Sequence, residues 1–336
     1  MTKVTESPHE ALALTSDDLL GMHRTMLLAR LIDEAELRQN RMGRAPFVVP
    51  VSGHEGCQVG TAWAMRAGRD IWLPYYRDLA VVLLAGMTPT EIFYGLFSKA
   101  LDPSSGGRQM PNHWGSRRLG IVSHSSPIAT QIPHAAGLAF AAAYRGEDAV
   151  AACWFGEGAT SEGDWHEGMN FAAIHRVPAI FVCENNEYAI SVPQSKQMAV
   201  RDVASRAEGY GMPGVVVDGG DVLACYAAMR EAHDRARAGD GPTLIECKTY
   251  RFLPHTSDDD DKTYRSKAEV EEHRHHDPID RFTAYLIDHG MIDHEGVKVV
   301  HADLKRDVET AIDEAWDAPD PAPETATRHV FEEDAR

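Results

Sequence analysis

The chain has 336 residues, of which 43% are hydrophobic and 25% charged, which is the composition of a globular protein with a sizeable core. Its 33 basic and 51 acidic residues give a formal net charge of −18, which argues against nucleic acid or an anionic membrane surface as a partner. No apolar run approaches the ~20 residues that span a bilayer. The first residues carry neither a secretory nor an organelle targeting pattern, which predicts a cytoplasmic protein.

In chain order, the sequence predicts a short arm, one α/β domain and a tail. Residues 1–15 are interpreted as a mobile arm, and Thr15 then begins a stretch of helical spacing that runs to about Arg41. The domain extends over residues 16–318, and three closely spaced prolines open a tail over residues 319–336. The five cysteines show no CxxC spacing, which predicts buried, reduced thiols.

Two stretches in the first third of the chain carry candidate functional residues. Tyr76 and Arg77 follow a short apolar run, and an arginine at a strand end can bind two phosphate oxygens while a tyrosine hydroxyl adds a hydrogen bond. A surface ion pair is the alternative for Arg77. Residues 102–117 are rich in Gly, Pro and Ser and predict a loop, on which His113 is either structural or close to an active site.

Residues 125–133 read Ser-Ser-Pro-Ile-Ala-Thr-Gln-Ile-Pro and precede an alanine-rich stretch. Hydroxyl and carbonyl groups at such a helix entry can ligate an ion or cap the helix. The residues alone leave both interpretations open.

The central stretch predicts a βαβ unit. Residues 149–155 and 179–183 are short apolar runs typical of buried parallel strands, and Ser161 is the expected N-cap of the helix between them. A right-handed crossover brings both strand ends to one edge of a sheet. Glu157 and Asn186 should therefore converge where open α/β sheets bind their ligands.

The residues at this edge suit a hard cation. Mg²⁺ takes a carboxylate, carbonyl oxygens and substrate phosphates in octahedral geometry, and Glu157, the Asn186 side chain and a nearby backbone carbonyl could supply the protein ligands. A Rossmann-type NAD dehydrogenase is an alternative diphosphate-binding α/β protein. Its motif needs a third glycine, where this chain has Ser161.

Further along the chain, Asp221 is the predicted N-cap of a helix, and residues 242–249 predict another strand. His255 follows that strand on the ligand edge, which is a good position for chemistry. The aspartate run 258–261 cannot pack in a core and predicts a solvated loop. Two amphipathic helices are expected to end the domain, at residues 279–289 and 295–316.

Gly156-Glu157-Gly158, followed about thirty residues later by Asn185-Asn186, resembles the diphosphate–metal motif of thiamine-diphosphate enzymes, which usually carries aspartate in place of Glu157. The segment from Gly156 to Ser191 resembles the α subunit of the 2-oxo acid dehydrogenase E1 component, most of all its branched-chain type. The resemblance covers about residues 20–330. It implies the thiamine-diphosphate-binding fold, an α/β fold with a mostly parallel sheet flanked by helices, an N-terminal helical extension and C-terminal helices.

The resemblance also implies roles for individual residues. His255 would be the active-site histidine on a mobile loop, and His113 would face the substrate. The implied contacts to the cofactor, apart from His255, are Tyr76, Arg77, Ser126, Ile128, Gly158 and Ala159. The implied Mg²⁺ ligands are Glu157, Asn186 and the Tyr188 carbonyl, and those of a K⁺ site are Ser125, Pro127, Thr130 and Gln131.

The activity implied is thiamine-dependent oxidative decarboxylation of branched-chain 2-oxo acids, with reductive acylation of the lipoyl group of a separate E2 acyltransferase. The glutamate that activates the cofactor would come from a β subunit, so the resemblance predicts an α2β2 heterotetramer and an inactive isolated chain. The alternatives are a pyruvate or acetoin dehydrogenase E1 α subunit and a non-catalytic interaction subunit.

Two positions depart from relatives. Glu184 stands where some of them carry a diphosphate-binding arginine, so either its side chain points away or the site is less positive. Thr256 stands where mitochondrial relatives carry a regulatory phosphoserine.

Overall fold

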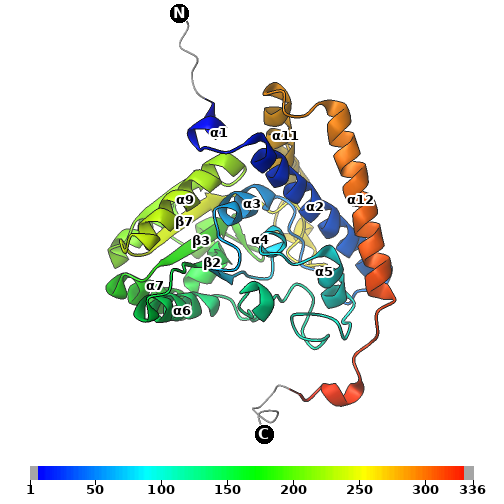
Figure 1. Ribbon diagram of the computed structural model, residues 1–336, viewed down its shortest axis with the longest axis horizontal. Helices are drawn as coiled ribbons and strands as arrows, with labels where there is room; N and C mark the ends of the chain where they lie inside the picture. Colours follow the sequence, from blue (N-terminus) through cyan, green and yellow to red (C-terminus); the bar gives the residue numbers. More distant parts are fainter. Residues whose placement is uncertain (1–6, 329–336) are drawn as a thin grey trace, which may run out of the picture.

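A five-stranded parallel sheet lies at the centre of the computed structural model, which describes residues 7–328 (Figure 1). All of its strand pairs are parallel, which confirms the predicted α/β fold with a mostly parallel sheet flanked by helices. In spatial order the strands are β1 (Ile71–Leu73), β2 (Ala151–Gly156), β3 (Ala179–Asn185), β7 (Thr243–Lys248) and β6 (Gly214–Asp218).

The pairing of β2 with β3 places two predicted site residues together. Gly156 at the end of β2 lies opposite Glu184 in β3, so both strands finish at the same edge of the sheet. Glu157 and Asn186 are the residues that follow the two strands. The predicted convergence at the carboxyl edge is therefore confirmed, and it follows from the crossover rule for parallel strands.

Helices cover both faces of the sheet, because alternate side chains of each strand point to opposite sides. In β2, Ala152 and Trp154 belong to one buried apolar cluster, whereas Cys153 and Phe155 belong to the other. The first face carries α3 (Glu55–Trp63), α4 (Leu79–Leu84) and α9 (Val222–Arg237), and the second carries α6 (Gln131–Arg145), α7 (Gly163–His175) and η3 (Val203–Tyr210) (Figure 1).

Further helices extend the first layer and connect the strands. The long helices α2 and α12 pack against each other and lie side by side in Figure 1. The remaining elements are α1 (Pro8–Ala11), α2 (Ser16–Arg41), α5 (Pro89–Leu96), η1 (Arg117–Leu119), η2 (Glu157–Ser161), β4 (Tyr188–Ala189), β5 (Val192–Pro193), α8 (Gln194–Gln197), η4 (Asp261–Thr263), α10 (Lys267–Arg274), α11 (Pro278–Asp288), α12 (His294–Trp316) and η5 (Pro323–Thr325).

Two of the three predicted helix N-caps are confirmed, and one is wrong. Thr15 accepts a hydrogen bond from the Asp18 N–H at 3.1 Å, and Asp221 caps α9 through two backbone N–H groups, so both predictions are confirmed. The predicted cap at Ser161 is wrong, because α7 begins two residues later and Glu162 holds the cap position. The intervening residues form η2, in which the Thr160 hydroxyl donates to the Glu157 carbonyl at 2.7 Å.

Parts of the predicted arm and tail, residues 1–6 and 329–336, lie outside the described residues. Within the described part, α1 forms a short helical turn and Ala100 donates a backbone hydrogen bond to Pro319 at 2.9 Å. The mobility of the arm and the domain limits stay predictions. All five cysteines are buried and free, as predicted. Within residues 7–328, no helix combines the length and apolar character that crossing a bilayer requires.

Candidate active site

A cavity of about 260 Å³ opens at the carboxyl edge of β2 and β3. It brings together segments that are far apart in the sequence, and it includes most of the predicted site residues. The predicted residues on its wall are Tyr76, Arg77, Ser126, Ile128, Gln131, Glu157, Gly158, Ala159, Asn186, Tyr188 and His255.

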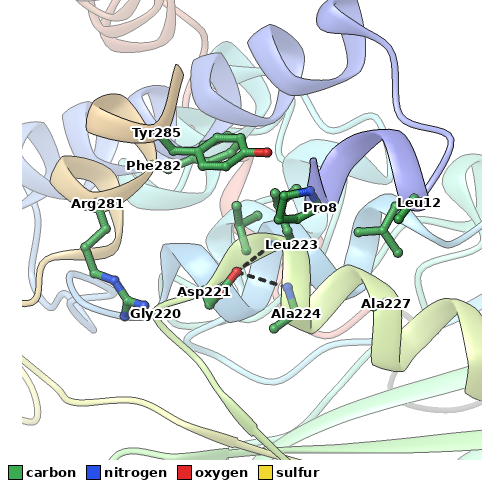
Figure 2. Close-up of a pocket in the computed structure, with 12 residues that line it drawn as sticks. Pro8, Leu12, Gly220, Asp221, Leu223, Ala224, Ala227, Arg281, Phe282 and Tyr285 are labelled. Carbon is green, nitrogen blue, oxygen red and sulfur yellow. Dashed lines mark hydrogen bonds between the residues drawn. The ribbon is translucent and has the colours of Figure 1, made fainter. Parts of the chain in front are cut away.

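A larger cavity of about 530 Å³ lies between α1, α9 and α11 (Figure 2). Its wall is mostly apolar, and its two charged residues are already engaged. Asp221 caps α9, and Arg281 forms an ion pair with Asp218 at 2.9 Å. Because the predicted site residues lie elsewhere, the cavity at the sheet edge is the candidate active site.

Glu157 is the predicted cation ligand in the candidate site. Its side chain is buried, and its Oε2 accepts a hydrogen bond from the Asn186 N–H at 3.2 Å. Its Oε1 has no hydrogen-bond partner among the described residues, although a buried polar atom normally has one. Burial raises the pKa of Glu157 to about 7, and backbone hydrogen bonds and two nearby arginines oppose that rise. A bound cation would satisfy the free oxygen and stabilise the charged carboxylate.

The other oxygens at this position suit magnesium. The Asn186 side chain and the Tyr188 residue line the same cavity as Glu157. Within residues 7–328, no three His, Cys, Asp or Glu side chains gather into a metal cage. A set of one carboxylate, one amide and one backbone carbonyl is compatible with a hard cation that also takes phosphate oxygens.

Two buried arginines give the cavity its positive charge. The Arg77 guanidinium lies 3.2 Å from Nδ1 of His255 and also donates to the Pro50 carbonyl. Arg251 lies 3.3 Å from the same Nδ1 and donates to the Ile190 carbonyl at 2.8 Å. Burial, followed by the charge of Arg77, lowers the pKa of Arg251 to about 10, so it stays protonated at neutral pH.

Sequence reasoning did not select Arg251 as a site residue. The signal that could have found it is its position three residues after β7, on the same ligand edge as the other candidates.

The contacts of His255 show which of its ring nitrogens carries the proton. Because a guanidinium only donates hydrogen bonds, Nδ1 between Arg77 and Arg251 must be the acceptor, and the ring proton is on Nε2. Burial and then the two arginines lower the pKa of His255 to about 3. The ring is therefore neutral near pH 7, with an N–H that can donate to a ligand.

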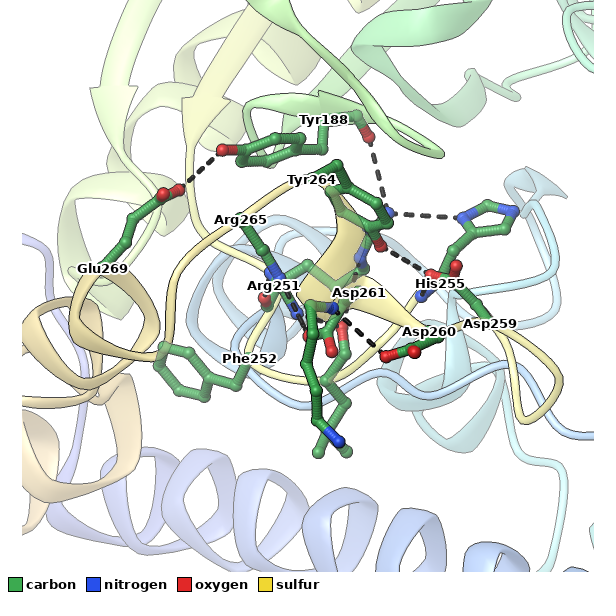
Figure 3. Close-up of polar contacts among 12 residues, drawn as sticks. Tyr188, Arg251, Phe252, His255, Asp259, Asp260, Asp261, Tyr264, Arg265 and Glu269 are labelled. Atoms are coloured by element: carbon green, nitrogen blue, oxygen red, sulfur yellow. Dashed lines mark hydrogen bonds and ion pairs between the residues drawn. The ribbon is translucent and has the colours of Figure 1, made fainter.

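A polar network fixes the loop that carries His255 (Figure 3). The backbone N–H of His255 donates to the Asp259 carboxylate at 2.7 Å, and the Tyr264 hydroxyl donates to the same carboxylate at 2.5 Å. Asp261 pairs with Arg265 at 2.7 Å. Asp258 and Asp260 also accept hydrogen bonds, from the Ser257 hydroxyl and the Lys262 N–H, and none of the four aspartates is buried. The run stays out of the core, as predicted, but its side chains also hydrogen-bond to nearby residues. Their partners lie up to five residues away, and the charge count did not reveal them.

The same network reaches the metal side of the cavity through two tyrosines. The Tyr188 hydroxyl donates to Glu269 of α10 at 2.7 Å (Figure 3). The Tyr250 hydroxyl donates to the same carboxylate at 2.8 Å. α10 is therefore hydrogen-bonded to Tyr188, whose carbonyl is the predicted magnesium ligand.

Several oxygen atoms lie close together in the loop before α6. The hydroxyls of Ser125 and Thr130 lie 2.8 Å apart, and both donate to the Pro127 carbonyl at 3.2 Å. Ala129 in this loop has a positive φ of 69°, which is strained for a residue with a side chain. Gln131 donates to the Trp154 carbonyl, while its Oε1 lacks a partner among the described residues.

His113 lies behind Ser126 and is absent from the cavity wall. Its Nε2 is 2.6 Å from the Ser126 hydroxyl, and its Nδ1 is 3.0 Å from the Pro111 carbonyl. A carbonyl only accepts, so Nδ1 carries the proton and Nε2 accepts from Ser126. His124, which sequence reasoning did not select, stacks on this ring with centroids 4.8 Å apart.

Glu184 does not face the cavity. It is fully buried and accepts hydrogen bonds from Gln58 at 3.2 Å and from the Tyr75 hydroxyl at 3.0 Å. Of the two alternatives for this residue, the structure supports a side chain that points away from the ligand.

The parallel sheet and the cavity at its carboxyl edge define an α/β protein with a candidate ligand site. The chain belongs to the dehydrogenase E1 component family, whose model matches residues 23–324. This membership confirms the predicted resemblance and excludes the Rossmann dehydrogenase. It implies thiamine diphosphate as the cofactor, a β subunit as a partner and a place in a multienzyme complex.

Curated relatives carry E1 α-subunit names. The chain is 50% identical to the 2-oxoisovalerate dehydrogenase subunit alpha of Bacillus subtilis, over 96% of this chain and 98% of the relative. It is 42% identical to the 3-methyl-2-oxobutanoate dehydrogenase subunit alpha of Mycobacterium tuberculosis, over 91% and 81% of the two chains. It is 41% identical to the pyruvate dehydrogenase E1 component subunit alpha of Staphylococcus aureus, over 90% and 79%.

Proposed function

We propose that the chain is the α subunit of an E1 component that decarboxylates branched-chain 2-oxo acids and transfers the acyl group to the lipoyl group of E2. The observation that carries this proposal is the cavity in which a free carboxylate oxygen of Glu157 lies on the same wall as Arg77 and Arg251. The substrate class is supported by the relatives named for 2-oxoisovalerate and 3-methyl-2-oxobutanoate. Pyruvate and acetoin are the alternative substrates.

The diphosphate end of the cofactor is held by cations and backbone groups. Mg²⁺ binds to Glu157, Asn186 and the Tyr188 carbonyl. Its charge combines with that of the arginines to neutralise the diphosphate. The groups that bind the diphosphate directly are Tyr76, Arg77, Arg251 and the amides of Gly158 and Ala159.

The close approach of η2 to β4 explains a glycine in this set. A Cβ at Gly158 would meet the Ala189 side chain at 2.9 Å, which is too close without a shift of the chain. The glycine therefore lets the η2 backbone lie near β4 at the cavity wall.

A second cation holds the loop before α6. K⁺ binds the oxygen atoms of Ser125, Pro127, Thr130 and Gln131, and the loop then presents Ser126 and Ile128 to the cofactor. The clustered oxygens of the first three residues and the free Oε1 of Gln131 support this site.

When bound, thiamine diphosphate supplies a nucleophilic carbon and an electron-accepting ring. The chain's own contribution at the reacting centre is a neutral His255, whose Nε2–H donates to the substrate oxygen on which negative charge develops. His113 keeps the Ser126 hydroxyl in one orientation. Ile128 adds an apolar side chain to the cavity wall.

The β subunit covers an apolar surface of α6 and α7, and the complex is an α2β2 heterotetramer. Both helices start at the cavity, since Gln131 opens α6 and η2 leads into α7. Their outer side exposes large apolar side chains, although a monomer rarely exposes a contiguous patch of this kind. The members of this surface, which we call the α6–α7 patch, are Phe140, Tyr144, Phe171 and Ile174.

The substrate is tested with the chain and its β subunit reconstituted together, in the presence of thiamine diphosphate and Mg²⁺. The rate of reduction of an artificial electron acceptor is compared for 2-oxoisovalerate, pyruvate and acetoin, because acetoin has no carboxyl group to lose and cannot be followed by decarboxylation. The proposal predicts the highest kcat/KM for 2-oxoisovalerate. A preference for pyruvate or acetoin would refute the branched-chain assignment.

A further inference from the structure

Glu184 is a buried carboxyl group without a basic partner. It lies in β3, where its backbone neighbours in the sheet are Gly156 and Cys247. Its exposed fraction is 0%, and none of the described Lys or Arg side chains forms a salt bridge with it. Burying such a group is costly unless hydrogen bonds satisfy it. Its hydrogen bonds should therefore show what it does.

Each partner of Glu184 belongs to, or holds, the turn that begins at Tyr75. The Tyr75 hydroxyl and the Gln58 amide donate to the same oxygen, at 3.0 and 3.2 Å. The other oxygen, Oε1, has no hydrogen-bond partner among the described residues. Glu184 thus connects α3 and the turn before α4 through one carboxylate oxygen.

The partners in turn bind the backbone of that turn. Gln58 donates to the Arg77 carbonyl at 2.9 Å and accepts from the Ala80 N–H at 3.2 Å. Asp78 accepts from the Tyr75 N–H at 2.7 Å. The backbone before and after Arg77 is therefore fixed by Asp78 and by Gln58, and Gln58 also binds Glu184.

The turn presents Tyr76 and Arg77 to the cavity. The Tyr76 ring lies edge-on to His255 with centroids 6.1 Å apart, and Arg77 binds the same histidine. A shift of the turn would move both side chains relative to His255 and to the cavity wall.

We infer that Glu184 is a positioning residue, which acts through Tyr75 and Gln58 to hold Tyr76 and Arg77 in the geometry that binds the cofactor diphosphate. This inference rests on the proposed function of the cavity. It assigns the acidic residue at this position a supporting role, with the positive charge at the diphosphate supplied by Arg77 and Arg251.

The inference predicts different effects for two substitutions at the same position. Glu184→Gln keeps an acceptor oxygen for Tyr75 and Gln58. Glu184→Leu fills a similar volume but leaves these buried groups unpaired. Tyr75→Phe removes one of the hydrogen bonds only.

The experiment uses the complex of the chain with its β subunit and measures the Kd of thiamine diphosphate at saturating Mg²⁺, together with kcat and KM for the 2-oxo acid. We expect Glu184→Leu to raise the cofactor Kd about tenfold or more, and Tyr75→Phe to raise it by a smaller factor. At saturating cofactor, kcat recovers toward the wild-type value. Glu184→Gln stays within about threefold of the wild-type Kd.

A matched control separates positioning from general destabilisation. His233 is buried and bonds to Asp70 at 2.9 Å, away from the cavity, so His233→Leu should lower the melting temperature without changing the cofactor Kd. A wild-type Kd in Glu184→Leu would overturn the inference, as would an equal rise in the His233 control. If Glu184→Leu does not fold, the Kd of Tyr75→Phe decides, and an unchanged value there overturns the inference.

The proposed function fails separately from this inference. A wild-type complex that does not bind thiamine diphosphate would overturn both. A wild-type complex that binds it, with the Glu184→Leu and Tyr75→Phe variants unchanged, would overturn only the role of Glu184.

Discussion

At the scale of single residues, the candidate site combines groups whose protonation is set by burial and by neighbouring charge. His255 remains neutral because it is buried and because two guanidinium groups donate to its Nδ1. Glu157 keeps one carboxylate oxygen without a partner among the described residues. A neutral donor beside a cation site is suited to stabilising negative charge on a substrate oxygen rather than to accepting a proton.

His255→Gln tests this role. The amide oxygen can still accept from Arg77 and Arg251, so the cofactor Kd should change little. The donor at the reacting centre is displaced, and kcat for decarboxylation should fall about 100-fold. Steady-state kinetics with the reconstituted complex give both values. A kcat within about threefold of wild type would contradict a direct role of this ring.

Sequence reasoning found the residues whose chemistry is encoded in a motif, and it did not find those that depend on packing. Glu157 and Asn186 follow strands, so the crossover rule places them together. His124 and the partners of Glu184 meet their neighbours across more distant elements. No spacing in the sequence reveals such contacts, because the folded arrangement of α3, β3 and the loop after β7 creates them.

At the scale of elements, the strands were predictable because alternate side chains of β2 and β3 enter two different cores. Caps were predictable where a side chain meets the first turn directly, as Thr15 and Asp221 do. The start of α7 was not predictable, because residues 157–161 form η2 at the cavity wall. The 3-10 turn at the cavity therefore displaces the helix start that Ser161 alone would predict.

A pH effect is expected where α2 meets the loop between α5 and η1. Glu36 is buried in α2 and accepts from Asn112 at 3.2 Å. Burial, and then the charge of Asp33, raises the pKa of Glu36 from its ordinary value of 4.5 to about 8. Between these values the folded state binds more protons than the unfolded state, so the free energy of unfolding falls as the pH rises.

Glu36→Gln removes this titration and keeps an acceptor for Asn112. Its melting temperature should exceed that of wild type at about pH 8 and match it near pH 4.5, where little of the effect has developed. Thermal melts at the two pH values check the difference. The same difference at both pH values would show that Glu36 does not titrate in this range.

Removing potassium tests the loop before α6. The oxygens of Ser125, Pro127 and Thr130 lie within 3.2 Å of one another and lose their proposed cation when K⁺ is replaced by tetramethylammonium. The cofactor Kd should then rise, and Thr130→Val should show the higher Kd in either salt. A Kd that does not depend on the cation would contradict the site.

At the scale of the whole molecule, the proposed function gives the chain one side of a cofactor site. The cavity wall holds groups for a diphosphate and a cation, and the family implies a β subunit. The α6–α7 patch lies on the outer side of two helices that begin at this cavity. We therefore expect the β subunit both to complete the cofactor site and to cover the α6–α7 patch.

Tyr144→Glu tests the patch, since Tyr144 is 86% exposed and can change without disturbing the core. A charge there should weaken assembly with the β subunit, measured by analytical ultracentrifugation, and lower the activity at limiting β subunit. Val299→Glu is the matched control, because Val299 is 52% exposed on α12. Equal assembly of both variants with the β subunit would exclude the patch as the contact.

The binding of thiamine diphosphate to the reconstituted complex, titrated calorimetrically with and without Mg²⁺ for wild type and Glu157→Gln, tests the central claim most directly. The account predicts Mg²⁺-dependent binding in wild type and a Kd raised about tenfold or more in the variant, because the carboxylate that holds the cation is lost. Equal, Mg²⁺-independent affinity in both proteins would contradict the claim that this cavity holds the diphosphate end of the cofactor.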